Sequence, residues 1–486
     1  MALIIIIDLL AVTILCGIAL SKGLEPALPF VAFVLTLAPV EAVIPLPGLF
    51  GLTTQRLVVI ALALLYLLLP GGKSELSSLK TPLKWLILAH VVWCCVSTAN
   101  SVVPIMSGKK MLSVVLEYYL LYYISFKTVR NKETVTRILF GISAAVIVAS
   151  VFGAIEAYRN WSIMEWFPSM THHFSGAADL SQSGRDIRVQ STFGNPILFG
   201  GALVVGITCA LYLLTRTQRA RGRLFLWIGI LSMSLCVYKA ESRGPWLALV
   251  LSYILLLVLG SSQVRRYLAV VGLLTLFVLV IRPGVWATVT NIYYESFDPE
   301  SPLGSSYDYR YALRHVVVDA LAKSPQRGLW GYGMESFYDL HLVGQLEGKP
   351  YTFLSCDSAW LELTIETGYV GLLLIAMLLL APARTAWRDF RQHSGPDRYL
   401  DLHLFVCMSV YYFMMLSVGM YSWGQNGYML WILIAATMAT ATSKEPKLNK
   451  TVSMTDSHTS GSQIRFAHAS RKGVICSYAI QRQVIP

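Results

Sequence analysis

Apolar stretches of about 20 residues recur along most of this chain, separated by short polar segments. A helix of that length crosses the hydrocarbon core of a bilayer, which is about 30 Å thick. It also satisfies its own backbone hydrogen bonds, which lipid cannot do. The pattern therefore predicts an all-α polytopic membrane protein with about 12–13 transmembrane helices. The predicted spans cover residues 3–20, 27–46, 53–70, 83–99, 110–126, 135–156, 195–215, 224–240, 245–260, 267–281, 359–381, 400–418 and 426–442.

In the first two predicted spans, charged residues and prolines interrupt the apolar sequence. Asp8 lies within the first and Glu41 within the second, and several prolines crowd the second span. Proline removes a backbone donor and ends or kinks a helix. If these two segments form a re-entrant pair, the count of crossings falls to the lower value.

The composition agrees with a membrane protein. The chain has 486 residues, of which 55% are hydrophobic and 14% are charged, whereas soluble domains carry roughly 25% charged residues. These values exclude a soluble enzyme. The net charge of +12 would suit nucleic acid on a soluble surface, but here the basic residues lie in short segments between apolar runs. We therefore expect membrane lipids, and no nucleic acid, as partners.

The basic segments orient the predicted spans, because lysine and arginine near span ends mark the cytoplasmic side. Five basic clusters fall on one side of the membrane, and only Lys109 and Lys110 depart from this rule. The clusters are Lys73, Lys80 and Lys84; Lys127, Arg130, Lys132 and Arg137; Arg216, Arg219, Arg221 and Arg223; Arg265 and Arg266; and Arg384, Arg388, Arg391 and Arg398.

This orientation divides the chain into transmembrane parts, two outer loops and a tail. The large outer loop is rich in aromatic residues, which pack a lid, lie at the membrane interface or stack on sugars. Within it, residues 311–323 predict an amphipathic helix that Ser324-Pro325 ends, followed by a turn-rich strip up to Gly333. The parts are N-terminal spans 1–156, first loop 157–194, central spans 195–281, large loop 282–358, C-terminal spans 359–442 and a disordered cytoplasmic tail 443–486.

Arginines on the outer side are candidates for binding phosphate. Arg188 precedes a span, Arg243 lies in a short turn between two spans, and Arg310 and Arg314 lie in the large loop. The guanidinium is planar and always charged, so it suits the oxygens of a lipid-linked diphosphate. The alternative is structural: Arg243 pairs with Glu241 or reaches the lipid headgroups.

Carboxylates gather where the span after the large loop begins. Glu362 and Glu366 are four residues apart and share one helical face. A carboxylate there is suited to act as general base toward a sugar hydroxyl, so Asp357 and Glu362 are the candidate catalytic residues. For Asp357 the alternative is a helix N-cap, a role that Ser358 also suits.

Four segments together resemble the O-antigen ligase and O-antigen polymerase family, bacterial inner-membrane proteins of the C-type glycosyltransferase class. They are the strip from Arg188 to Phe199, the Ser242-Arg243-Gly244 turn, the Arg310 to Gly333 region and the span opening from Asp357 to Gly371. The resemblance covers roughly residues 180–380.

The resemblance implies a site in which periplasmic arginines bind the diphosphate of an undecaprenyl-linked oligosaccharide. The saccharide passes to an acceptor glycan or lipid with inversion, without a metal and without any other cofactor. Arg188, Arg243 and Arg310 match the family's arginine positions. Many ligases have a histidine where this chain has Asp357, which favours a polysaccharide polymerase.

Other functions stay open at this level. Within the same class are an O-antigen ligase and a protein O-oligosaccharyltransferase, which differ in their acceptor. A solute or anion transporter would use charged residues inside the spans, for which Asp8, Glu41, Arg56 and Glu117 are scattered candidates. A structural partner of other polysaccharide export proteins is the remaining alternative.

Overall fold

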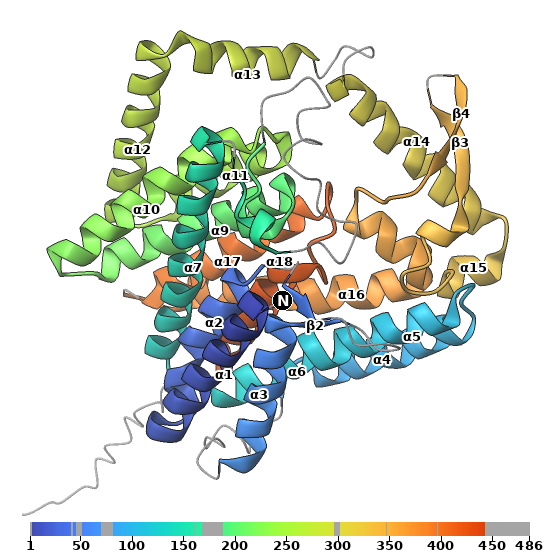
Figure 1. Cartoon of the computed structure of the whole chain (residues 1–486), viewed down its shortest axis with the longest axis horizontal. Helices are drawn as coiled ribbons and strands as arrows, with labels where there is room; N and C mark the ends of the chain where they lie inside the picture. Colours follow the sequence, from blue (N-terminus) through green and yellow to red (C-terminus); the bar gives the residue numbers. More distant parts are fainter. Residues whose placement is uncertain are drawn as a thin grey trace, which may run out of the picture. The chain divides into compact units, whose positions relative to one another are not determined.

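The computed structural model describes residues 2–39, 42–44, 51–69, 81–159, 161–167, 188–295, 302–346, 348–395 and 397–442. Within these ranges the chain is built almost wholly from helices (Figure 1), and a helix lies at every predicted span. Glu41, Lys73, Lys80, most of the first loop and the predicted tail lie outside the described residues. The helices at the predicted spans are α1 (Ala2–Lys22), α2 (Leu28–Leu37), α3 (Thr54–Leu68), α4 (Lys84–Ala99), α5 (Pro104–Ser113) continued by α6 (Leu120–Thr128), α7 (Lys132–Arg159), α9 (Pro196–Arg216), α10 (Ala220–Lys239), α11 (Arg243–Leu259), α12 (Ser262–Ile281), α16 (Ala359–Gln392), α17 (Asp397–Met414) and α18 (Gly424–Thr442).

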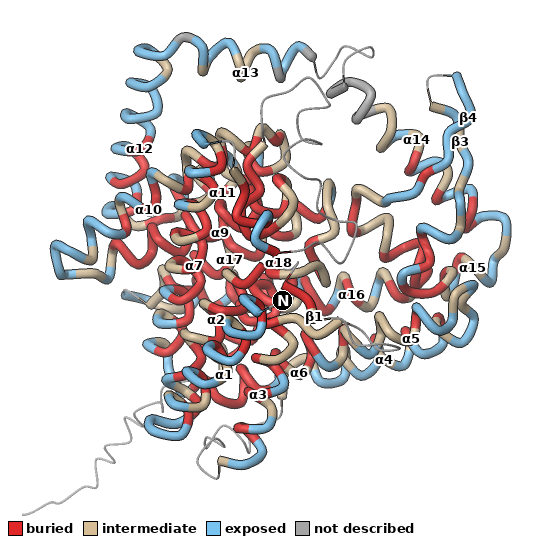
Figure 2. The backbone as a smooth tube through the Cα atoms, in the orientation of Figure 1, coloured by how far each residue is buried: buried red, intermediate tan, exposed pale blue. Residues whose placement is uncertain are grey.

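The length and apolar surface of these helices confirm an all-α polytopic membrane protein. In the described part of the chain, six helices are long and apolar enough to cross a bilayer, namely α1, α7, α9, α10, α12 and α16. Helices α9 and α18 form the buried centre, whereas α12 is largely exposed (Figure 2). Its exposed side chains include Leu273, Phe277 and Val280. A large apolar face that no protein covers is suited to lipid.

The second predicted span is wrong at its C-terminal end. A short 3-10 turn (Glu25–Ala27) leads into α2, and α2 stops at Leu37 rather than continuing to residue 46. Ala38 turns to an extended conformation because it precedes Pro39, whose ring disfavours the helical state of its neighbour. The chain then forms β1 (Val43–Ile44), which pairs antiparallel with β2 (Leu52–Thr53).

The large loop is an ordered structure over its described residues. It contains α13 (Pro283–Glu295), α14 (Pro302–Ala322), α15 (Pro325–Trp330) and an antiparallel hairpin of β3 (Leu342–Leu346) and β4 (Lys349–Phe353). The predicted helix over 311–323 is confirmed as the second half of α14. The predicted turn-rich strip is wrong in part, because Ser324 caps α15 and Pro325 occupies its first turn.

Apolar side chains of α14 hold this loop against the beginning of α16. Leu313, Val317 and Leu321 recur at helical spacing and are buried together with Phe353 of the hairpin and Ile365 of α16. The loop and the opening of α16 therefore share one apolar cluster, which fixes the loop over the charged residues of that helix.

Helix α16 is broken at Gly368, where φ is +70° and ψ is −179°. Only glycine adopts this conformation without strain. The break frees carbonyl groups of the preceding turn, and each finds a donor from elsewhere in the chain. Tyr332 N donates to Ile365 O, Gly333 N and Ser97 Oγ donate to Glu366 O, and Trp93 Nε1 donates to Thr367 O, at 2.8–2.9 Å. Residues 359–367 thus form a short helical segment held by α4 and the large loop.

Candidate functional site

Connections that are distant in sequence meet at one end of the helices, which we call the loop side. Val102 N, between α4 and α5, donates to Tyr332 O of the large loop at 3.0 Å. Ala359 N, at the start of α16, donates to Met415 O, after α17, at 3.0 Å. The connection after α4 therefore lies against the large loop, and the connection after α17 lies against the start of α16.

Two of the predicted arginines lie on neighbouring segments of the loop side. Arg188 Nε donates to the carbonyl of Ala240 at 3.1 Å, and Val189 N donates to the carbonyl of Lys239 at 3.2 Å. Arg243 is the first residue of α11, three positions after Ala240. The strip that carries Arg188 is therefore bound to the turn that carries Arg243.

Residues 415–417 connect this turn to the start of α16. A Cβ placed on Gly244 would lie 3.1 Å from Ser417 Oγ, so the chain at Arg243-Gly244 packs closely against this segment. On its other side the same segment accepts hydrogen bonds from Ser358 and Ala359 at Met415 O. The arginine turn and the carboxylate-bearing helix are thus separated by a single strip of chain.

Arg310 and Asp357 are brought together as an ion pair. Arg310 Nη2 lies 3.5 Å from Asp357 Oδ2, and their side chains are 32% and 37% exposed. Burial raises the pKa of Asp357, and the positive charge of Arg310 partly opposes that rise. Among the described residues, Nε of Arg310 is buried without a hydrogen-bond partner. This nitrogen is therefore available to an anion that enters between the loop and α16.

The N-cap alternative for Asp357 and the predicted role of Arg314 can be compared with the geometry. Ser358, not Asp357, caps α16, because its side chain accepts from Leu361 N at 3.5 Å. Arg314 lies one turn beyond Arg310 on an exposed position of α14. In the described part of the chain no ion pair or hydrogen bond joins Arg314 to Asp357, so the structure does not bring it into the cluster.

Glu362 and Glu366 line a small cavity together with a lysine that sequence analysis did not select. Lys110 of α5 lines the same cavity and forms an ion pair with Glu335 of the large loop at 3.0 Å. Glu362 is half-buried and Glu366 is buried. The signal for Lys110 was present in the sequence, since Lys109 and Lys110 are the basic residues that break the charge rule. The structure places this exception to the charge rule beside the candidate carboxylates Glu362 and Glu366.

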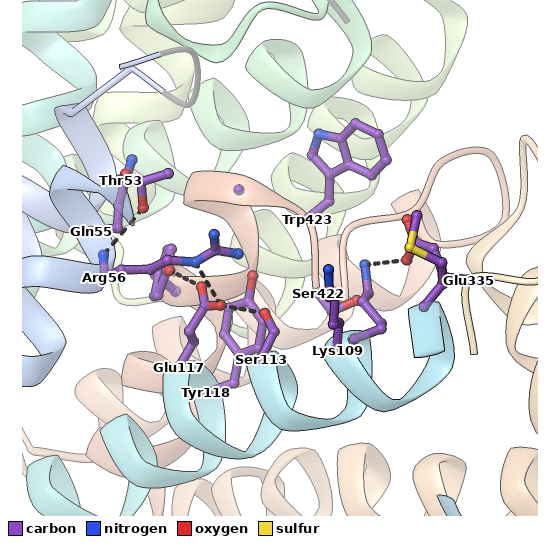
Figure 3. A pocket seen from close by; sticks show the side chains of 14 residues that line it. Thr53, Gln55, Arg56, Lys109, Ser113, Glu117, Tyr118, Glu335, Ser422 and Trp423 are labelled. Atoms are coloured by element: carbon purple, nitrogen blue, oxygen red, sulfur yellow. Dashed lines mark hydrogen bonds and ion pairs between the residues drawn. The ribbon is translucent and has the colours of Figure 1, made fainter. Parts of the chain in front are cut away.

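A larger cavity of about 460 Å³ adjoins this one and shares Lys110, Ser422 and Trp423 with it. Figure 3 shows Arg56, Ser113 and Glu117 at one end and Glu335 at the other. Arg56 and Glu117, which are scattered in sequence, form an ion pair of 2.9 Å. Asp8 accepts a hydrogen bond from Thr54 at 2.5 Å. The ion pair joins two of the candidates for a transport path, and the hydrogen bond from Thr54 engages a third, Asp8.

The aromatic residues of the loop pack largely against one another. The ring centroids of Tyr309 and Phe353 are 5.0 Å apart, and those of Tyr351 and Phe353 are 5.2 Å apart. Tyr309 also donates to Ser355 O at 2.7 Å, and burial raises its pKa to about 12. Of the three, Phe353 is fully buried, four positions before Asp357, whereas Tyr351 remains 42% exposed.

Comparison with known proteins adds one finding. Residues 228–376 match the family model described as O-Antigen ligase. The matched segment runs from α10 into α16 and includes Arg243, Arg310, Asp357 and Glu362, but neither Arg188 nor Lys110. No curated protein matches the chain.

Proposed function

We propose that this chain, which matches the O-antigen ligase family model over residues 228–376, transfers or polymerises saccharides held on undecaprenyl diphosphate. The proposal rests on one observation above all: within the matched segment, Arg310 pairs with Asp357 at the opening of α16, beside the carboxylates of Glu362 and Glu366. The loop side is then periplasmic, the protein lies in the bacterial inner membrane, and the C-terminus is cytoplasmic.

The charges of the site suit the leaving group of this reaction. A hydroxyl oxygen of the acceptor attacks the anomeric carbon as the bond from that carbon to the diphosphate oxygen breaks. The diphosphate leaves on its lipid with an additional negative charge. In this proposal Arg188, Arg243 and Arg310 bind it, since fixed cations in a dry site stabilise charge as it develops. With these guanidinium groups no metal is required for charge stabilisation, and a single displacement inverts the anomeric centre.

A carboxylate receives the proton of the acceptor hydroxyl. Asp357 and Glu362 are the candidates, because both lie on the loop side and are five positions apart, one just before α16 and the other in its first turn. Asp357 is held by Arg310, and Glu362 lies close to the 415–423 segment, with its Oε2 3.1 Å from a Cβ placed on Gly419. Glu366 lines the same small cavity as Glu362 and is the third carboxylate near the start of α16.

Two activities of this class are favoured by different observations. Asp357 stands where many ligases have histidine, which favours a polymerase, whereas the family match favours a ligase. Deletion of the gene followed by analysis of the cell's glycans tests both. Loss of long chains with intact single repeat units indicates a polymerase, and accumulation of full-length lipid-linked polymer indicates a ligase. Unchanged glycans would contradict glycosyl transfer and favour transport.

The pH dependence of transfer should report the ion pair of Arg310 and Asp357. If Asp357 accepts the proton, the rate falls on acidification through a pKa that burial has raised above the ordinary value of 3.8. Removing the cation in Arg310→Ala raises that pKa further, so the acid limb moves to higher pH. Arg310→Lys retains the charge and should leave the limb near its original position. The measurement is a pH–rate profile in membrane vesicles, and an unshifted limb in Arg310→Ala would exclude Asp357 as the base.

A further inference from the structure

The cavity of about 460 Å³ is lined by none of the three arginines proposed to bind the diphosphate. Its volume lies in the range of ligand sites, roughly 300–1,000 Å³. It is lined by α3, α5, the start of α18 and Glu335 of the large loop. It adjoins the cavity of Glu362 and Glu366, with which it shares Lys110, Ser422 and Trp423. A molecule bound in it would therefore reach toward these carboxylates.

Four of the five charged residues that line this cavity form two ion pairs, and Lys109 adds a third cation. Arg56 lies 2.9 Å from Glu117, and Lys110 lies 3.0 Å from Glu335. Ser113 and Tyr428 also donate hydrogen bonds to the carboxylate of Glu117. A phosphate in this space would face the two carboxylates as well as the cations, so the lining suits a strong anion less well than the arginines of the donor site do. It does offer both donors and acceptors, which is what sugar hydroxyls require.

A π-helix forms part of the wall. Residues Val114–Tyr119 continue α5 in this conformation and carry Glu117 and Tyr118. π-helical turns are rare and frequently occur at functional sites, because they redirect side chains at a cost in helix stability. Tyr118 packs beside Tyr428, with ring centroids 5.0 Å apart. The unusual turn thus presents a carboxylate and an aromatic ring to the same cavity.

Aromatic and apolar groups complete the lining. Trp423 and Met106 border the cavity, and in Figure 3 the indole of Trp423 lies across it from Glu117 and Tyr118. A pyranose ring has apolar faces that fit aromatic rings and an edge of hydroxyls that fits paired polar groups. Ligand sites commonly combine an apolar wall with a few such polar groups.

We propose that this cavity is the acceptor site, where the terminal sugar of the growing or receiving glycan binds between Trp423 and Glu117 with a hydroxyl directed toward Glu362. The inference rests on the proposed glycosyl transfer and assigns the two substrates to opposite sides of the α16 carboxylates. The diphosphate-linked donor lies with the arginines, and the lipid-free end of the acceptor lies against α3, α5 and α18.

Two neighbouring residues of α5 offer a matched test. Met106 lines the cavity, whereas Ile105 is 76% exposed and does not line it. Met106, itself 54% exposed, lies at the rim of the cavity. Met106→Trp places a larger side chain there, and Ile105→Trp adds the same side chain outside the cavity. The probe is the oligosaccharide repeat of the producing cell, released from its lipid carrier and free of diphosphate. Its binding to the full-length protein in lipid nanodiscs is measured by saturation-transfer NMR.

We expect the wild-type protein and Ile105→Trp to bind the oligosaccharide equally, and Met106→Trp to bind it at least about 10-fold more weakly, a difference of about 1.4 kcal/mol. Inorganic diphosphate should not displace the oligosaccharide. Trp423→Ala should weaken binding as well, which provides a second variant if Met106→Trp does not fold. Absence of binding to the wild-type protein, equal binding by Met106→Trp and Ile105→Trp, or displacement by diphosphate would each overturn the inference.

These outcomes are separate from the test of the proposed function. If deletion of the gene changes the cell's glycans but Met106→Trp binds normally, glycosyl transfer stands and the acceptor site lies elsewhere. If binding depends on Met106 but deletion leaves the glycans unchanged, the cavity binds saccharide, and both the transfer reaction and the acceptor role are overturned.

Discussion

Arg243→Ala is expected to lower the rate of glycosyl transfer by about 100- to 1,000-fold, the usual loss when one fixed group that stabilises transition-state charge is removed. Arg243 opens α11 beside the strip that carries Arg188 and is separated from the start of α16 by residues 415–417. Its charge would act on the diphosphate as the glycosidic bond breaks. The effect should therefore fall on kcat as well as on the KM for the donor.

Two further variants define what Arg243 contributes. Arg243→Lys keeps the charge but loses the planar fork that binds two phosphate oxygens, so we expect an intermediate rate. Arg266→Ala removes an exposed arginine from the basic segment at the start of α12 and should leave the rate unchanged. The measurement is transfer of lipid-linked repeat units in membrane vesicles with matched protein amounts. A wild-type rate for Arg243→Ala would remove this residue from the donor site.

Gly368→Ala is expected to destabilise the protein strongly and to abolish transfer through misplacement of Glu366. The φ of +70° with ψ near 180° is strained for any residue with a Cβ, at a cost of roughly 1–3 kcal/mol. The added Cβ would also lie 2.0 Å from the backbone oxygen of Leu329. That oxygen belongs to α15, so relief requires the loop to move away from the break.

Gly272→Ala is the matched control, because a Cβ at Gly272 in α12 meets no atom within 4 Å. Alanine is a better helix former than glycine by about 1 kcal/mol, so this variant should unfold at the same temperature as the wild type or slightly higher. Thermal unfolding in detergent, followed by size-exclusion chromatography, gives the comparison. Equal unfolding temperatures for the two variants would show that the break at Gly368 is not required for stability.

Most helices were predictable because the length and hydrophobicity that a transmembrane helix needs can be read from its own segment of the sequence. A span must remain apolar for about 20 residues whatever it packs against. The predicted segments from 53–70 onward coincide with helices to within several residues, except that α16 continues to Gln392, well past the predicted end at residue 381. The end of the second helix could also be predicted from neighbouring residues, since Pro39 disfavours the helical conformation at Ala38. The prediction failed there because hydropathy alone was followed past the proline.

The candidate site was predictable in part. Arg310 and Asp357 are 47 positions apart by number, yet both were selected because each residue type suits its task, and the fold pairs them. Lys110 and Glu335 were not selected. Lys110 stands out in the sequence only as an exception to the charge rule. Its ion pair with Glu335 requires α5 to lie beside the large loop, which neither segment indicates by itself.

The sequence by itself determined the membrane class, the positions of most helices and the residue types that suit a diphosphate. Only the tertiary structure decided which charges meet. The pairing of Arg56 with Glu117, the π-helix at Val114–Tyr119 and the break at Gly368 each depend on neighbours distant in the chain. The physical reason is that hydrophobicity acts on every residue separately, whereas a hydrogen bond or an ion pair requires two groups that only folding brings within reach.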